Sequence, residues 1–200
     1  MSASPTPHIL YLHGFNSSPE SHKARVLAEH MHAAGLASQL TVADIPSRPT
    51  FAETYLDVMC LRLMEANRLC VVGSSLGGFY ATWLAERHGL DAVLINPAVR
   101  PHLRLREFIG TNENFHTGES WEFTSQDVDT LERMYRTSLA DPRRYRVLLQ
   151  TGDETLDYRD AETYYAGSDM LIEAGGDHSF SGFASHLDDI LQRCGFSSRM

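Results

Sequence analysis

Lysine is almost absent from this sequence of 200 residues, in which Lys23 is the only one. The 17 basic residues are therefore nearly all arginine, and 26 acidic residues bring the net charge to -9. Nucleic acids and anionic membrane surfaces bind proteins through clustered lysine and arginine, because these side chains neutralise phosphates. The sequence therefore predicts that neither nucleic acid nor a membrane is a partner.

Long apolar stretches are missing as well. No segment approaches the roughly 20 residues that a membrane-spanning helix needs. The N-terminal sequence MSASPTPHIL lacks the basic start and the apolar stretch of a signal peptide. We therefore expect a cytoplasmic protein.

Cysteine is scarce, and the usual patterns of metal ligands do not occur. Cys60, Cys70 and Cys194 show no CxxC spacing and leave one thiol over in any pairing, which favours buried or free thiols in a reducing compartment. His30 and His32 lie two positions apart on an expected helix, and so on different faces of it. Because there is no HExxH motif and no Cys/His cluster either, we expect no metal site.

Short apolar runs alternate with segments of helical periodicity along most of the chain. The expected strands are 8–14, 39–46, 68–74, 91–99, 144–153 and 168–177. The expected helices are 18–35, 50–67, 75–89, 157–167 and 179–195. Strands that alternate with helices pair in parallel through right-handed crossovers, with helices on both faces. The sequence therefore predicts one three-layer α/β domain over residues 1–200, with a mainly parallel sheet of about six strands. Thr50 and Glu53 match a capping box at the start of the second helix.

Residues 100–143 interrupt this alternation. The segment is too long for an ordinary connection, and it has no strand signal long enough to join the sheet. Its clearest helix is TSQDVDTLERMYRTSL, residues 124–139, and it also carries Phe108, Trp121 and Phe123. We expect a cap-like, partly helical insertion that lies over the sheet.

The stretch VVGSSLGGFY lies between an expected strand and an expected helix. Within it, Gly73 to Gly77 form a GxSxG motif centred on Ser75. A nucleophile at such a sharp turn has a strained backbone, so the residues two positions away must be nearly free of side chain. A small-residue turn is the alternative, since GxSxG also occurs by chance. A phosphate-binding loop is a weaker alternative, because GSSLGG has neither the Lys-Ser/Thr of a P-loop nor the G-x-G-x-x-G order.

A serine hydroxyl is inert at neutral pH unless a base accepts its proton, and the base needs an orienting carboxylate. Asp153 follows the strand in RVLLQTGDETLDY, and His178 follows the last strand in MLIEAGGDHSF. Loops beyond the carboxyl ends of parallel strands converge on one edge of the sheet, so we expect both residues beside the serine. Asp157 and Asp177 compete for the acid role. Asp157 is more typical of a helix N-cap, and Asp177 is the immediate neighbour of His178.

The first expected strand ends in LHGF, Leu12 to Phe15. The backbone N–H of Phe15 could face that of Leu76, which starts the helix after Ser75, and two such donors would form an oxyanion hole. The alternative is a strand followed by a glycine turn, in which His13 only makes a local hydrogen bond. Because the serine, acid and base are all present, we favour the oxyanion hole.

Six blocks that run from Tyr11 to Phe183 together resemble the YqiA/YcfP-type esterases, which are small α/β-hydrolases. The blocks are YLHGFNSSP, VVGSSLGGFYATWLAE, INPAVRP, GTNENFHTGE, QTGDETLDYR and EAGGDHSFSGF. The resemblance implies an α/β-hydrolase fold reduced at its N-terminus, with activity on short acyl esters and acyl-CoA thioesters. It also implies that Ser75 is the nucleophile, Asp153 the acid and His178 the base.

The predicted function is therefore hydrolysis of an acyl ester or an acyl-CoA thioester through a Ser-His-Asp triad, without a cofactor. We expect His13, Arg100, Arg104 and Arg106 to bind the substrate, the arginines by contacting an anionic leaving group such as coenzyme A. One alternative is a peptidase or amide hydrolase with the same triad. The other is a binding module that keeps the fold without the chemistry.

Overall fold

A parallel sheet forms the centre of the computed structural model, which describes residues 5–115 and 117–197. Its strands are β1 (Thr6–Leu12), β2 (Leu40–Val42), β3 (Asn67–Ser74), β4 (Asp91–Ile95), β7 (Tyr145–Gln150) and β8 (Asp169–Glu173). The order across this six-stranded sheet is β2-β1-β3-β4-β7-β8, and every neighbouring pair runs parallel. The predicted sheet is confirmed.

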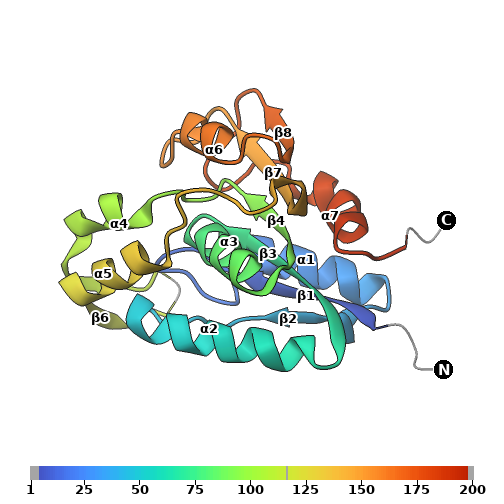
Figure 1. The fold of residues 1–200 in the computed structure, drawn as a ribbon, viewed down its shortest axis with the longest axis horizontal. Helices are drawn as coiled ribbons and strands as arrows, with labels where there is room; N and C mark the ends of the chain where they lie inside the picture. The colour runs from blue at the N-terminus through green and yellow to red at the C-terminus, as the bar shows by residue number, and fades with distance from the viewer. Residues whose placement is uncertain (1–4, 116, 198–200) are drawn as a thin grey trace.

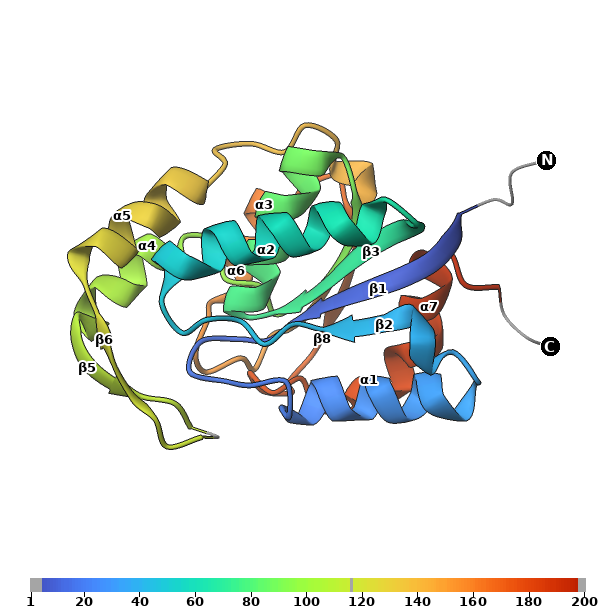
Figure 2. The ribbon, with the colours of Figure 1, turned by 90° about the horizontal axis from the view of Figure 1, so that it is seen from below.

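Helices cover both faces of the sheet (Figure 1). They are α1 (His22–Ala33), α2 (Pro49–Met64), α3 (Leu76–His88), α6 (Tyr158–Tyr164) and α7 (Leu187–Arg193). Short 3₁₀ helices occur at Ala37–Gln39, Leu105–Phe108, Pro142–Arg144 and Phe183–His186. Figure 2 shows α2 and α3 above the strands and α1 and α7 below them, which is the predicted three-layer arrangement.

The alternation of side chains along each strand explains the two layers of helices. Leu10 and Leu12 of β1 face the core under α2 and α3, whereas Ile9 and Tyr11 face the core under α1 and α7. All four are almost fully buried. Successive side chains of a strand point to opposite faces, so an apolar run such as HILYL needs a cover on both sides. Cys60, Cys70 and Cys194 are buried free thiols within these two cores.

Residues 100–143, the cap segment, leave the sheet after β4. Their elements are α4 (Pro101–Arg104), the 3₁₀ helix Leu105–Phe108, β5 (Gly110–Glu113), β6 (Ser120–Phe123) and α5 (Ser125–Met134). The segment is partly helical, as expected, but β5 and β6 also form a separate antiparallel hairpin that the sequence did not predict. β5 is entirely polar, and β6 has only two apolar residues, Trp121 and Phe123, so each strand is too short for its pattern to mark a strand. Helix α5 ends before the predicted residue 139, because Tyr135 has an extended backbone with ψ 139°.

The capping box predicted for α2 is wrong. No side chain caps α2, whose first residue is Pro49, and the hydroxyl of Thr50 instead donates to Asp127 Oδ1 at 2.7 Å. The capping box of the structure belongs to α5, where Thr124 and Asp127 cap each other. Arg48 also donates to the Asp127 carboxylate, from Nε to Oδ2 at 3.1 Å. A fully buried carboxylate therefore ties the cap segment to the start of α2.

We expect Asp127→Asn to lower the free energy of unfolding at pH 7 by about 3 kcal/mol, because it breaks a buried ionic hydrogen-bond network. Burial alone would raise the pKa of the Asp127 carboxyl, but hydrogen bonds from Thr50 and Thr124 lower it below its ordinary value. A lowered pKa means that the carboxylate stabilises the fold above about pH 4 and stops doing so as the pH falls through the folded-state value. The stability gap between wild type and Asp127→Asn should therefore narrow from pH 7 towards pH 3 in urea denaturation.

Asp129→Asn is the matched control, because Asp129 lies on the exposed face of the same helix. Its stability should stay within about 0.5 kcal/mol of wild type at pH 7. A gap for Asp127→Asn that stays constant with pH would contradict the assigned charge state.

Candidate active site

The strand-to-helix turn at Ser75 is the centre of the site. β3 ends at Ser74 and α3 begins at Leu76, and Ser75 between them has the left-handed backbone angle φ 57°. Hydrogen bonds to the end of β4 and to the loop after it hold this turn, since Ser75 N–H donates to Ile95 O at 3.1 Å and Ala98 N–H donates to Ser75 O at 3.0 Å. A strained residue of this kind persists only when its surroundings fix it.

The glycines of the GxSxG motif are required by close backbone contacts. A Cβ on Gly73 would lie 2.2 Å from the carbonyl oxygen of Gly77, and one on Gly77 would lie 2.1 Å from the carbonyl oxygen of Leu12. A carbon atom cannot approach a backbone oxygen so closely. The turn therefore has the steric constraint that the motif predicts.

The structure brings Ser75, Asp153 and His178 together, each from a loop after a different strand of the sheet. His178 Nε2 lies 3.0 Å from Ser75 Oγ. His178 Nδ1 lies 2.8 Å from Asp153 Oδ2 and 3.0 Å from Oδ1. The Asp153 side chain is 2% exposed and the His178 side chain 24% exposed, so substrate can reach the base while the acid is shielded from water.

The environment of Asp153 keeps its carboxyl group ionised. Burial alone would raise the pKa of Asp153, but the hydrogen bond with His178 and those from the backbone N–H groups of Leu156 and Thr155 lower it below its ordinary value. A carboxylate only accepts hydrogen bonds, so the proton of a neutral His178 lies on Nδ1. The lone pair of Nε2 then faces the hydroxyl of Ser75, as a general base requires.

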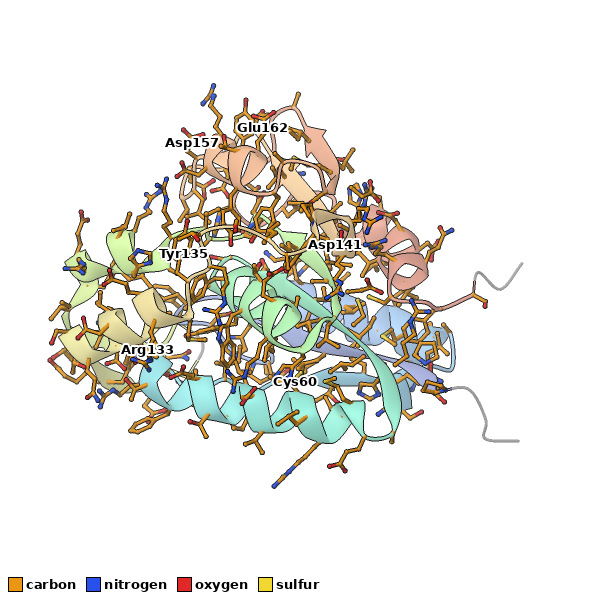
Figure 3. All side chains as sticks on the ribbon, in the orientation of Figure 1. Cys60, Arg133, Tyr135, Asp141, Asp157 and Glu162 are labelled. Carbon is orange, nitrogen blue, oxygen red and sulfur yellow. The ribbon has the colours of Figure 1, made fainter. Side chains whose placement is uncertain are left out.

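The two competing aspartates make other contacts. Asp157 Oδ1 accepts the backbone N–H of Arg159 at 3.0 Å and so caps α6, as predicted. Figure 3 shows Asp157 on the outside of the molecule beside α6. Asp177 Oδ2 accepts the hydroxyl of Ser181 at 2.6 Å. Among the aspartates, Asp153 is the one that the structure places against the His178 ring.

Two buried amides hold the loop that carries His178, and the sequence had not indicated them. Asn96, which is 2% exposed and has φ 40°, donates from Nδ2 to Asp177 O at 3.0 Å and accepts the backbone N–H of Gln150 at 3.0 Å. The Gln150 side chain donates to Ser181 O at 2.7 Å and accepts the N–H of Asp177 at 3.1 Å. The signal available in the sequence was the distinctive block INPAVRP, in which Asn96 directly follows β4.

The chain's lysine contacts the same loop from α1. Lys23 of α1 donates from Nζ to Ser179 O at 3.0 Å, one residue after His178. Burial lowers the pKa of the Lys23 ammonium, while nearby Asp177 and Asp153 act to raise it. The loop that carries the base is therefore fixed by residues at the ends of β4 and β7 and by a residue of α1.

The expected oxyanion groups also lie beside Ser75. A Cβ on Gly14 would be 3.6 Å from Ser75 Oγ, so the loop after β1 passes next to the serine at the residue before Phe15. Leu76 is the first residue of α3, where the helix dipole favours negative charge. Within residues 5–115 and 117–197, no hydrogen bond is donated by the backbone N–H of Phe15 or of Leu76.

A cavity of about 410 Å³ opens next to Ser75 and His178. Its walls are mainly apolar and come from Phe15, the start of α3, the loops after β4 and β7, and the cap segment. They include Phe15, Leu76, Val99, Leu103, Phe108 and Leu156. Such a cavity beside a nucleophile can hold the apolar part of a small molecule.

The four residues predicted to bind substrate do not all reach this cavity. Arg100 and Arg104 line it, and Arg100 is paired with an aspartate, Asp160, at 3.2 Å. Arg106 lies elsewhere on the cap, where it pairs with Glu132 at 3.4 Å.

His13 is not among the residues that line the cavity. Its Nε2 accepts the backbone N–H of Ile45 at 3.3 Å, and its Nδ1 bonds to Gly14 O at 3.1 Å. The buried ring therefore joins the loops after β1 and β2 rather than facing a substrate. The bond to Gly14 is the local hydrogen bond named as the alternative for His13, whereas the bond to Ile45 had no sign in the sequence.

Neither a metal site nor a membrane-spanning helix is found in the described part of the chain. Residues 5–115 and 117–197 contain no group of three or more His, Cys, Asp or Glu side chains arranged to hold a metal ion. Within the same ranges, no helix has both the length and the apolar composition to cross a bilayer.

Solved structures that share this architecture define the class of the fold. Alpha/beta hydrolase domain-containing protein 10 from mouse is 15% identical with a TM-score of 0.72, over 96% of this chain and 92% of that chain. Est1E from Butyrivibrio proteoclasticus is 13% identical with a TM-score of 0.67, over 96% and 86%. An S-formylglutathione hydrolase from Agrobacterium tumefaciens is 14% identical with a TM-score of 0.63, over 96% and 84%. The chain has the α/β-hydrolase fold.

Within that class, the chain belongs to the uncharacterised protein family UPF0227, whose model matches residues 8–194. This is the family of the YqiA/YcfP-type proteins, so the resemblance found in the sequence is confirmed.

Because Asp153 contacts the His178 ring and Asp157 caps α6, we expect only a substitution of Asp153 to slow the reaction of Ser75. Asp153→Asn should slow labelling of Ser75 by a fluorophosphonate probe by up to about 10⁴-fold, because the wrong tautomer of His178 would face the serine. Asp157→Asn is the matched control, and its labelling rate should stay within about threefold of wild type while α6 loses roughly 1 kcal/mol of capping energy. Equal rates for the two variants would contradict the assignment of the acid.

Proposed function

We propose that this protein is a serine hydrolase that cleaves carboxylic esters and thioesters. The observation that carries the proposal is the relay in which His178 lies 3.0 Å from the hydroxyl of Ser75 and 2.8 Å from the carboxylate of Asp153. Ionised Asp153, the free lone pair of His178 and the strained turn at Ser75 are what an activated nucleophile requires. The name of the S-formylglutathione hydrolase, one of the proteins with a similar fold, is in keeping with this chemistry.

In the proposed reaction, His178 removes the proton of Ser75 while Oγ attacks the acyl carbonyl carbon. The carbonyl oxygen takes the electron pair and is stabilised by the N–H groups of Phe15 and Leu76. His178, whose positive charge Asp153 stabilises, then gives its proton to the departing alcohol or thiol. Water attacks the acyl-serine by the same route, and no cofactor takes part.

The cavity supports substrates with an apolar acyl group. Its walls beside Ser75 are aliphatic and aromatic side chains, and its volume of about 410 Å³ exceeds the needs of an acetyl group. Arg100 and Arg104 lie at the same cavity, where they could contact an anionic leaving group such as that of an acyl-CoA thioester. We therefore propose short-chain esters and acyl-CoA thioesters as the substrate class.

Replacing each of the two adjacent serines tests the nucleophile. Ser75→Ala should lower kcat for p-nitrophenyl butyrate by at least about 10⁴-fold, since loss of a triad nucleophile costs several powers of ten. Ser74→Ala should stay within about threefold, because Ser74 ends β3 and is buried away from the relay. A fluorophosphonate probe should label wild type and Ser74→Ala. Labelling or hydrolysis that persists in Ser75→Ala would refute the proposal.

The apolar cavity predicts how the rate depends on acyl chain length. Each added methylene that becomes buried is worth about 0.8 kcal/mol, so kcat/KM should rise about fourfold per methylene from acetate upwards until the cavity is full. p-Nitrophenyl esters of increasing chain length measure this slope. Leu103→Ala should flatten the slope and leave the acetate rate nearly unchanged, because Leu103 lines the cavity as an aliphatic side chain of α4. A flat wild-type profile would place the acyl group outside the cavity.

A further inference from the structure

Asn16, the residue after Phe15, has an unusual backbone. Its φ is 51°, in the left-handed region, and it is only 8% exposed. This conformation costs roughly 1–2 kcal/mol for a residue with a side chain, although asparagine tolerates it better than most. Contacts from elsewhere in the chain must therefore hold the loop in place.

Three hydrogen bonds reach this loop from the β5–β6 hairpin of the cap segment. Trp121 Nε1 donates to Asn16 Oδ1 at 2.9 Å. The backbone N–H of Phe115 donates to Asn16 O at 3.0 Å. Asn114 Nδ2 donates to Ser17 O at 2.9 Å. The side chain and the backbone of Asn16 are thus both fixed by a hairpin about 100 residues away in sequence.

The ring of Phe15 is held by aromatic residues of the same segment. It meets Phe108, Trp121 and Phe123 at centroid distances of 5.6, 5.7 and 5.9 Å, in each case edge to face. Edge-to-face pairs each contribute about 0.5–1.5 kcal/mol beyond simple burial. The cap segment therefore packs on the side chain of Phe15 and hydrogen-bonds to the next residue, Asn16.

We propose that the β5–β6 hairpin positions the backbone N–H of Phe15 for the oxyanion, with Trp121 and Asn16 as positioning residues. The inference rests on the proposed function, because it assigns a structural cause to the oxyanion hole of that reaction. A peptide N–H gains most as a donor when it is aligned before the reaction and does not reorganise in it. The ring and the Asn16 backbone are two of the groups joined to the Phe15 Cα, so fixing both restricts rotation about the N–Cα bond of Phe15 and with it the direction of the Phe15 N–H.

Trp121→Phe tests the proposal, since it removes the N–H donor and keeps an aromatic ring against Phe15. We expect kcat for p-nitrophenyl butyrate to fall about tenfold with KM within about twofold, as part of the 10²–10³-fold that a whole oxyanion donor supplies. Thr111→Val is the matched control. It removes a 3.2 Å hydrogen bond to Glu122 within the same hairpin but none to the oxyanion loop, so kcat should be unchanged.

A pair of inhibitors separates positioning from general loosening of the fold. When a trifluoromethyl ketone binds, the Ser75 Oγ–C bond forms, the carbonyl oxygen takes the electron pair and the proton moves to His178. Its Ki should rise in Trp121→Phe by the factor by which kcat/KM falls. The corresponding trifluoromethyl alcohol cannot form this adduct, and its Kd should stay within about twofold. Equal weakening of both compounds would overturn the proposal.

Asn16→Gly gives an independent test from the other side of the hydrogen bond. Glycine accepts the left-handed backbone and removes only the Oδ1 acceptor. The double variant with Trp121→Phe should be no slower than the slower single variant, because the two changes break one interaction. Additive losses, or wild-type kcat in both single variants, would overturn the inference while Ser75→Ala still showed the hydrolase to be real. If wild type neither hydrolyses esters nor reacts with the fluorophosphonate, the proposed function fails as well.

Discussion

The left-handed backbone of Ser75 is the constraint on which the site depends. The turn fits only because β1, β3 and α3 approach at backbone distance, with Gly77 lying directly against Leu12 O. It persists only because two hydrogen bonds fix the Ser75 backbone: its N–H donates to Ile95 at the end of β4, and its carbonyl oxygen accepts from Ala98 in the loop that follows. Strain of this kind costs roughly 1–3 kcal/mol, which the surrounding sheet must offset. The parallel sheet thus forms the core of the fold and also fixes the backbone conformation of Ser75.

The same constraint recurs around the serine. The described residues contain four non-glycine residues with positive φ, and these are Asn16, Ser75, Asn96 and Phe180. Each lies in a loop that follows a strand and meets at the site, after β1, β3, β4 and β8. Asparagine occupies two of the four positions; the Asn96 side chain donates to the loop after β8, and the Asn16 side chain accepts from Trp121 of β6. Backbone strain is therefore concentrated in the loops around Ser75. At Asn16 and Asn96, a buried amide side chain stabilises the strained loop.

Much of the fold and of the relay could be predicted from the sequence because both depend on local patterns. Apolar runs gave the strands, and residues directly after strands gave Ser75, Asp153 and His178. The rest depends on contacts between distant segments. The spacing of Thr124 and Asp127 is that of a capping box, but no local pattern shows that Asp127 also binds the start of α2. The β5–β6 hairpin escaped prediction for a similar reason, since Trp121 and Phe123 of β6 pack on Phe15, about 100 residues away in sequence.

The cap segment contributes to the site in two ways: it forms a wall of the cavity, and it packs on the ring of Phe15. Phe15 and Leu76 line the cavity beside Ser75, and in the proposed reaction their N–H groups stabilise the oxyanion. Phe108 of the cap both lines that cavity and packs on the ring of Phe15. In the proposed reaction, a change at Phe108 that alters which acyl group fits therefore also moves the residue that carries a donor. Acyl specificity and the rate of the chemical step would then be coupled through one aromatic cluster, whereas a substitution at Leu103, an aliphatic wall residue of α4, would alter specificity alone.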